Sequence, residues 1–188
     1  MNDEYEIKKT ISRLSSRLYG DIRVICSSEG ITQLKLDELV QSVTIDRIML
    51  ALSFYECAKK IEVQLHKQDG DYRSIISRCY YCQYHLARAL IFLITKDDID
   101  NHEKLPKKLG DCLKSVGASF IVDKLEQYRS IRNEVDYSPY PEIDGSLDAV
   151  ALKILRETES YIKLILQFFE ERGITIDTNT NLSCISGD

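Results

Sequence analysis

Apolar residues recur every three or four positions along most of the chain, which is the period of α-helices with one buried face. All three prolines lie beyond residue 105, so no proline interrupts a helix in the first half. The eight glycines occur singly, mostly where periodic segments end. The pattern therefore predicts an all-α protein.

The pattern of the N-terminal part predicts two helices separated by an unassigned segment. The first helix ends near Gly20, and one of its faces carries four apolar residues: Ile7, Ile11, Leu14 and Leu18. Residues 21–30 show a short strand-like alternation followed by a turn and are left unassigned. A weak helix is expected over residues 32–43.

Two long helices are predicted in the middle of the chain. Thr44 is a suitable cap for a helix that runs to about Lys67. Gly70 and Asp71 predict a turn and a cap before the second helix, over residues 72–95. That second helix is apolar on more than one side, which indicates a central position or an oligomer interface.

Three further helices complete a predicted antiparallel bundle. A short helix begins near Pro106, and another spans residues 118–136. The latter must end there because Ser138 precedes a proline. Ser146 can cap the last helix, whose apolar stripe continues to Phe169. The polar tail from residue 172 is expected to fray.

Length and charge narrow the functional classes. A chain of 188 residues is expected to form one domain. Its 25 Lys and Arg against 30 Asp and Glu give a net charge of −5, which argues against non-specific duplex binding through a broad basic face. The longest apolar stretch, residues 89–94, is too short to cross a membrane. The charged N-terminus is unlike a signal peptide, so we expect a soluble cytoplasmic protein.

Six cysteines without an export signal predict free thiols, mostly buried, rather than disulfides. Cys79, Cys82 and His85 stand three residues apart, as metal ligands often do. The second ligand pair of a zinc finger is missing, however. We therefore expect neither a metal nor a cofactor.

Most common active-site motifs are absent, including the phosphate-binding glycine loops and His-Glu-x-x-His. The most informative segment is residues 128–137, where Arg129, Arg132 and Asp136 share one helix face. The guanidinium groups of the two arginines have the fork geometry that suits a phosphate. An ordinary ion pair between Arg132 and Asp136 fits the same spacing equally well.

Two motifs carry a resemblance to a known family. Residues 77–90, SRCYYCQYHLARAL, closely resemble the SRxYYAxFHAARALL helix of HEPN domains, the higher-eukaryote and prokaryote nucleotide-binding domains. Residues 132–137, RNEVDY, are similar to the RNxADY helix end of one small prokaryotic branch. The resemblance covers residues 45–171, which leaves residues 1–44 as an N-terminal helical extension and residues 172–188 as a flexible polar tail.

The resemblance implies an antiparallel helical bundle that usually forms a homodimer, with the arginine motifs of both subunits near a shared cleft. Many members of the family are metal-independent ribonucleases in toxin–antitoxin, anti-phage and CRISPR systems. Their active motif pairs the arginine with a histidine several positions later. This chain departs from that motif, because Asp136 and Tyr137 occupy the positions where the histidine is expected.

The departure matters chemically. Cleavage of RNA without a metal needs a group whose pKa is near 7, and an aspartate, with a usual pKa of about 3.9, is a poor acid at neutral pH. The candidate catalytic set is therefore Arg132, Asn133 and Asp136, with His85 as a substitute acid–base group; Arg129 joins Arg132 in binding phosphate. Tyr137 is either a packing residue or, as in some HEPN toxins, a site of nucleotidylation.

Two functions follow from the resemblance. The first is a dimerising assembly or regulatory partner in a prokaryotic defence or toxin–antitoxin system, with a degenerate ribonuclease motif. The alternative is an active metal-independent endoribonuclease toxin that cleaves RNA at a dimer cleft. The partner expected in either case is a nucleotidyltransferase antitoxin or a larger defence complex.

Overall fold

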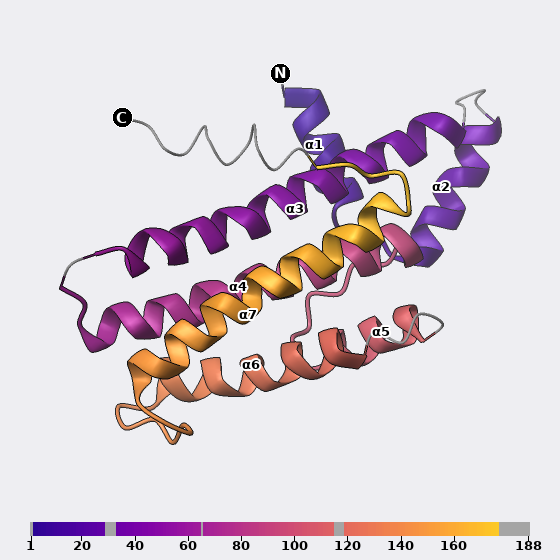
Figure 1. Ribbon diagram of the computed structural model, residues 1–188. Helices are drawn as coiled ribbons and strands as arrows, with labels where there is room; N and C mark the ends of the chain where they lie inside the picture. Colours follow the sequence, from indigo (N-terminus) through magenta and orange to yellow (C-terminus); the bar gives the residue numbers. More distant parts are fainter. Residues whose placement is uncertain (1, 29–32, 65, 115–118, 177–188) are drawn as a thin grey trace.

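The computed structural model describes residues 2–28, 33–64, 66–114 and 119–176 (Figure 1). Within these ranges every regular element is a helix, which confirms the predicted all-α class. The helices are α1 (Asn2–Ile11), α2 (Ser16–Ser28), α3 (Gln33–Glu62), α4 (Asp69–Thr95), α5 (Lys104–Leu113), α6 (Ser119–Tyr137) and α7 (Leu147–Glu170).

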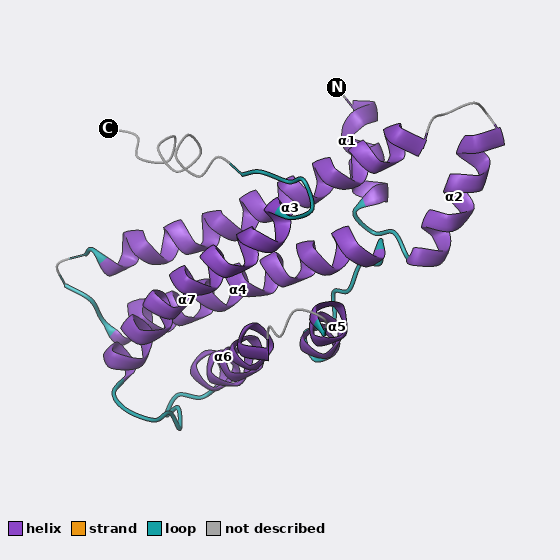
Figure 2. Ribbon diagram, turned by 45° about the vertical axis from the view of Figure 1, so that its right-hand side comes forward, coloured by secondary structure: helices purple, strands orange, loops and turns teal. Residues whose placement is uncertain are grey.

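Helix α4 is the centre of the bundle. It contacts α3, α5, α6 and α7, and α3 and α7 run along it over most of their length (Figures 1 and 2). Residues on several sides of α4 are buried, from Ile75 to Leu93. A helix that is apolar around most of its circumference must be enclosed by others, and the predicted central position is confirmed.

The N-terminal part differs from the prediction. The first helix ends at Ile11, and a second one, α2, extends through most of the stretch that the sequence left unassigned. Ser15 explains the interruption, because its hydroxyl accepts a hydrogen bond from the Leu18 amide at 3.2 Å. A serine in this position caps a new helix rather than continuing the old one.

Helix α3 is continuous where the sequence suggested two helices. Thr44 is therefore not a cap: it lies inside α3, fully buried, and its hydroxyl donates to the Val40 carbonyl at 2.8 Å. A threonine can satisfy its hydroxyl in this way within a helix, so the residue type did not mark a boundary. The domain boundary placed at residue 45 falls within α3 and stays a prediction.

The ends of the other helices lie close to their predicted positions. Helix α4 begins three residues early, at Asp69, and its first turn is closed by Asp71, whose carboxylate accepts the Gln68 amide at 2.8 Å. Ser146 takes the N-cap position of α7, although its side chain makes no capping bond. Past α7 the chain turns at Gly173, whose positive φ suits glycine, and Ile174 is buried. The tail from residue 177 lies outside the described residues.

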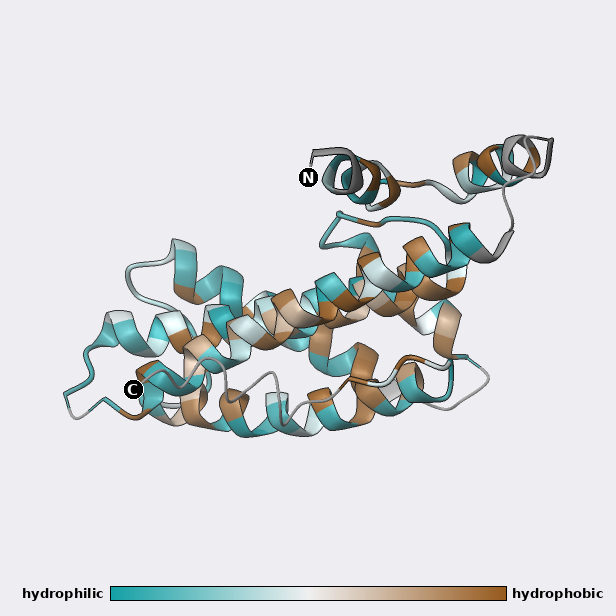
Figure 3. Ribbon diagram, turned by 90° about the horizontal axis from the view of Figure 1, so that it is seen from above, coloured by the Kyte–Doolittle hydropathy of each residue, from teal (hydrophilic) through white to brown (hydrophobic). Residues whose placement is uncertain are grey.

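The apolar core has two parts. The main one fills the space between α3, α4, α5, α6 and α7. The smaller one joins α1 and the first half of α3 to Phe92 of α4, and α1 and α2 stand at one end of the molecule (Figure 3). None of the described helices is long and apolar enough to cross a membrane.

Candidate functional site at the α4–α6 contact

The last turn of α6 is fixed to the start of α4 by Arg73. Its guanidinium donates hydrogen bonds to the carbonyls of Val135, Ser138 (2.8 Å) and Pro139 (3.1 Å). These carbonyls lie at the C-terminal end of α6, where the helix leaves acceptors unpaired and where a positive charge is favourable. Arg73 thus sets the position of the segment that carries Arg132.

Arg132 is held by three partners. Its Nε lies 2.7 Å from an oxygen of Asp136, one Nη donates to the Tyr81 hydroxyl at 2.5 Å, and the other donates to Asn133 at 3.0 Å. Only 14% of the Arg132 side chain is exposed, against 24% of Asp136. The ion pair that the spacing predicted is confirmed, and the guanidinium is engaged within its own chain.

Tyrosine rings surround the same guanidinium. Its central carbon lies 5.1 Å from the ring centre of Tyr81, 5.3 Å from that of Tyr137 and 6.0 Å from that of Tyr80. Burial acts to lower the pKa of Arg132, but the oxygens of Tyr81, Asp136 and Tyr137 outweigh it and the pKa is raised. The cation is therefore fixed in place and permanently charged.

A small pocket opens beside this cluster. It has a volume of about 240 Å³, and residues of α4 and α6 line it: Arg73, Ser74, Ser77, Arg78, Tyr81 and Asp136. Asp136 contributes a carboxylate to the wall and accepts a hydrogen bond from the Ser77 hydroxyl. An anion that enters the pocket meets two further arginines, but it must compete with Asp136 for Arg132.

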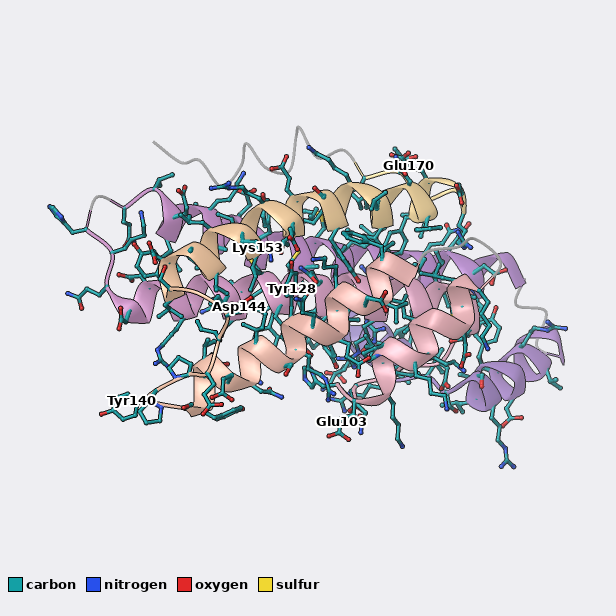
Figure 4. All side chains as sticks on the ribbon, turned by 60° about the horizontal axis from the view of Figure 1, so that its bottom comes forward. Glu103, Tyr128, Tyr140, Asp144, Lys153 and Glu170 are labelled. Atoms are coloured by element: carbon teal, nitrogen blue, oxygen red, sulfur yellow. The ribbon has the colours of Figure 1, made fainter. Side chains whose placement is uncertain are left out.

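Arg129 does not line this pocket. Its guanidinium lies 3.9 Å from Glu103 and 4.0 Å from Glu126. Glu103 projects at the outer edge of the molecule, in front of α5 (Figure 4). The Nε of Arg129 is buried without a hydrogen-bond partner in the described structure. The predicted phosphate-binding role of Arg129 stays a prediction.

His102 lies where the charges of the α6 arginines act on it, and no role was expected for it from the sequence. It lies in the loop before α5, where its Nδ1 is 2.7 Å from the Tyr80 hydroxyl and its ring stacks on Tyr84 at 4.0 Å. Burial lowers its pKa, and the charges of Arg132 and Arg129 lower it further. His102 is therefore a neutral imidazole in the electrostatic field of both arginines.

His85 lies elsewhere. Its ring stacks on Phe54 at 5.5 Å, and Phe54 in turn stacks on Tyr81, so two aromatic rings separate His85 from Arg132 within the chain. Burial lowers its pKa to about 4, with Arg88 as a further cause. His85 is neutral at physiological pH, and its predicted role as the acid–base group stays a prediction that a second subunit would have to complete.

The cysteines of α4 are buried thiols. Cys79 and Cys82 are fully enclosed, and burial raises the pKa of Cys79 to about 12. The described cysteines are all free, and two of them, Cys57 and Cys112, are not buried. Throughout the described ranges, no three His, Cys, Asp or Glu side chains are grouped so as to hold a metal ion.

Several residues of the site escaped the sequence analysis. Arg73, Ser77 and Tyr81 stand four residues apart, so they share one face of α4, and this spacing could have linked them to Arg132. The signal was hidden because α4 is apolar on its other faces, and Tyr81 resembled one more core residue. His102 carries no signal at all, since its position depends on how a loop folds back onto α4.

The comparison with known proteins agrees with this architecture. No curated protein matches the chain. The sequence model of the HEPN domain matches residues 55–171, from the second half of α3 to the end of α7. This range contains Arg132 and all its partners, whereas α1 and α2 lie outside it. The match spans more than half of the chain, and the protein belongs to the HEPN domain family.

Proposed function

We propose that this protein is a dimerising assembly or regulatory module of a prokaryotic defence or toxin–antitoxin system, in which the ribonuclease-like site is degenerate. The observation that carries the proposal is the ion pair between Arg132 and Asp136 at 2.7 Å. An RNA phosphate at this site would take the place that the carboxylate occupies. The chain thus supplies its own anion where a nuclease needs to bind the substrate.

The chemistry at this position supports the same proposal. Asp136 replaces the histidine expected in the family motif, and its carboxylate forms an ion pair with Arg132. A carboxylate in this position repels a phosphate and does not take the part of a histidine in moving a proton to a leaving oxygen. Arg132 and Asn133 are then retained as structural residues that tie α6 to Tyr81 of α4. This geometry favours a rigid binding surface over a catalytic site.

The test restores the missing group. Purified protein is incubated with total cellular RNA in EDTA, beside the variants Arg132→Ala and Asp136→His, and cleavage is followed on a denaturing gel. We expect no cleavage by the natural protein and Arg132-dependent cleavage after Asp136→His. Asp123→His, an exposed aspartate of the same helix, is the matched control. Arg132-dependent cleavage by the natural protein would overturn the proposal.

Dimerisation is measured separately, by light scattering during gel filtration of the full chain. The proposal expects a dimer at micromolar concentration. A protein that remains monomeric at this concentration would contradict the dimerising module, whatever the outcome of the RNA assay. An endogenous partner, a nucleotidyltransferase or a larger complex, is then sought by co-purification with the dimer.

One observation favours the alternative, an active metal-independent endoribonuclease. His102 lies in contact with Tyr80, close enough to Arg132 and Arg129 for both charges to lower its pKa. A neutral imidazole beside two arginines has the groups required to move a proton and to bind a phosphate. If cleavage occurs, His102→Ala should abolish it, and His85→Ala should leave it intact.

Tyr137 fits a modification site under either function. Its side chain is 76% exposed, and its ring lies 5.3 Å from the carbon of the Arg132 guanidinium. A nucleotidyl group attached to its hydroxyl would add negative charge next to Arg132 and block the pocket. Intact-mass measurement of the protein purified together with its partner tests this; Tyr137→Phe should remove any added mass, and an unchanged mass would contradict the modification.

A further inference from the structure

A second pocket lies at the other end of the molecule, where α1 and the first half of α3 meet the region that matches the HEPN domain. It has a volume of about 370 Å³ and is enclosed by residues of α1, α3 and α4. This volume is within the usual range for small-molecule sites, which is about 300–1,000 Å³. Cationic side chains dominate its polar lining: Lys8, Lys9, Arg47 and Arg88.

The base of this pocket contains an unbalanced buried charge. Arg88 donates to both oxygens of Asp98, at 2.7 and 2.6 Å, and Arg47 lies 2.8 Å from the same carboxylate. Only 11% of the Arg47 side chain and 9% of the Asp98 side chain are exposed. The Arg88 side chain is 21% exposed. Two guanidinium groups therefore share one largely buried carboxylate, which leaves a net positive charge in a partly buried place where charge is costly.

One nitrogen of Arg47 is also left without a partner. Its Nη2 donates to the Ser12 carbonyl and faces Asp98, and the guanidinium lies 4.5 Å from the centre of the Phe92 ring. The other nitrogen, Nη1, is buried and makes no hydrogen bond in the described structure. An unsatisfied N–H on a charged group carries a full desolvation penalty. A negative charge in the pocket would stabilise this cation electrostatically.

The rim adds charge and apolar surface. Lys8 pairs with Asp46 at 3.2 Å and Lys9 pairs with Glu6 at 3.3 Å, so both ammonium groups are held at the mouth of the pocket. Tyr5 lines the same mouth and is exposed. The combination of buried arginines, lysines at the rim and an exposed aromatic ring is suited to a ligand with an anionic end and an apolar end.

We propose that this pocket binds a small phosphate monoester, with its phosphate against Arg47 and Arg88 and its apolar portion against Tyr5. The inference is independent of the Arg132 site and of the proposed function. A phosphate suits the site better than a carboxylate because a dianion balances both the charge that Asp98 leaves uncompensated on the two arginines and the charge of a nearby ammonium group. The N-terminal extension, through α1, completes a site that the HEPN bundle alone does not have.

His85 reports on the occupancy of the pocket. Its side chain lines the wall between Arg47 and Arg88, and these charges add to burial in lowering its pKa. The remaining charged groups of the lining are Lys8, Lys9 and Asp46. A bound phosphate dianion offsets the neighbouring cations, so the His85 ring should titrate at a higher pH and its NMR signals should move.

The test uses the full chain with inorganic phosphate and phenyl phosphate as probes, followed by calorimetry and by the NMR signals of the His85 ring. Lys8→Glu removes a cation from the rim without touching the buried arginines, and Lys107→Glu on the exposed face of α5 is the matched control. We expect Lys8→Glu to weaken binding about three- to tenfold and Lys107→Glu to leave it unchanged.

The two probes identify the source of the phosphate. Tighter binding of phenyl phosphate than of inorganic phosphate supports a monoester ligand with an apolar portion. Equal binding of the two probes would show that the site recognises only the phosphate group, and the proposed monoester ligand would be wrong. Absence of binding by either probe at millimolar concentration would overturn the proposal. Binding that Arg132→Ala abolishes and Lys8→Glu does not would also overturn it, because the anion would then occupy the α6 site.

Discussion

The molecule contains two arginine–carboxylate clusters that differ in charge balance. At the α4–α6 contact, Arg132 pairs with its own carboxylate, Asp136, and both remain partly exposed. At the contact of α3 and α4, Arg47 and Arg88 share the single carboxylate of Asp98, which is 9% exposed against 24% for Asp136. One cluster is a balanced pair beside a pocket of about 240 Å³, whereas the other has two arginines for one carboxylate and lies beneath a pocket of about 370 Å³.

The difference shows that a retained family motif and a site able to bind an anion need not coincide. Arg132 belongs to the motif that defines the family resemblance, yet its two Nη groups donate to Asn133 and Tyr81, and Asp136 serves as its own ion-pair partner. Arg47 belongs to no motif, and it shares its only ion-paired carboxylate in the described structure with Arg88, whereas Arg132 has Asp136 to itself. A buried nitrogen without a hydrogen bond occurs in both arginines, Nη1 in Arg47 and Nε in Arg132. Charge balance in the fold, rather than the presence of an arginine in a motif, therefore indicates where an anion is needed.

The largest expected effect comes from removing the shared carboxylate. Asp98→Asn leaves Arg47 and Arg88 buried without a counter-ion, and we expect a loss of about 3–5 kcal/mol in the free energy of unfolding. Urea denaturation followed by circular dichroism measures it. Asp46→Asn, which breaks an exposed pair with Lys8, should cost at most about 1 kcal/mol. Equal losses in the two variants would contradict the buried charge imbalance.

The next effect concerns the anchoring of α6. Arg73→Ala removes the hydrogen bonds to the carbonyls at the end of that helix, and we expect a loss of about 2–3 kcal/mol, because each bond involves a charged donor. Arg78→Ala, which removes an exposed guanidinium 5.5 Å from the Phe54 ring, should cost about 0.5–1 kcal/mol. Thermal unfolding of both variants gives the comparison, and a larger loss for Arg78→Ala would refute the anchoring role.

His85, which lies beside Arg47 and Arg88, is expected to make the stability of the protein depend on pH. Its pKa in the folded protein is about 4, below its ordinary value of 6.5, because of burial. The unfolded chain therefore binds the proton first, and stability is lost as the pH falls from about 6.5 to about 4, with no further loss from this group below that. We expect about 2 kcal/mol after allowance for solvent screening of the exposed part of the ring.

The variant His85→Phe keeps the stack on Phe54 and removes the proton-binding group. The difference in unfolding free energy between the natural protein and His85→Phe, measured by urea denaturation from pH 7 to pH 4, isolates the contribution of this residue. His66→Gln, at an exposed histidine, is the control. A difference that stays constant over this pH range would show that His85 is not buried as a neutral group.

The smallest effect on stability is expected at the balanced cluster. Asp136→Asn weakens a partly exposed i,i+4 pair, so the loss should be at most about 1 kcal/mol, clearly less than for Asp98→Asn. The same change removes a negative charge beside Arg132 and should strengthen RNA binding, measured by fluorescence anisotropy with a short labelled RNA. Weaker RNA binding after this change would indicate that Asp136 supports the site instead of closing it.

Much of the fold could be read from the periodicity of apolar residues. The central position of α4, the end of α6 before the first proline of the next loop and the long amphipathic α7 follow from patterns that extend over many turns. The errors concern short-range signals, at Ser15 and Thr44, where one hydroxyl either caps a helix or bonds within it. Local sequence does not distinguish these two uses, because both satisfy the same hydrogen-bonding group.

In the candidate site, contacts within one helix could be predicted from the sequence, but contacts between helices could not. The pairing of Arg132 with Asp136 follows from spacing along one helix, whereas the contacts of Arg132 with Tyr81 and of Asp136 with Ser77 join different helices. Within one chain, the charge of Arg132 acts on the pKa of His102, whereas the role expected of His85 stays a prediction. A helix places its own residues by period alone, but the partner across a helix contact depends on packing.

The amino-acid sequence alone determined three features: the all-helical class, the central position of α4 and the placement of the arginine motif on one helix face. Each of them is a local or periodic property of the chain. Packing decided which charges are balanced. Asp98 lies ten residues from Arg88 and fifty-one from Arg47, and only the folded chain gathers them around one carboxylate. Burial then gives that arrangement its energy, because a charge costs little in water and much inside a protein.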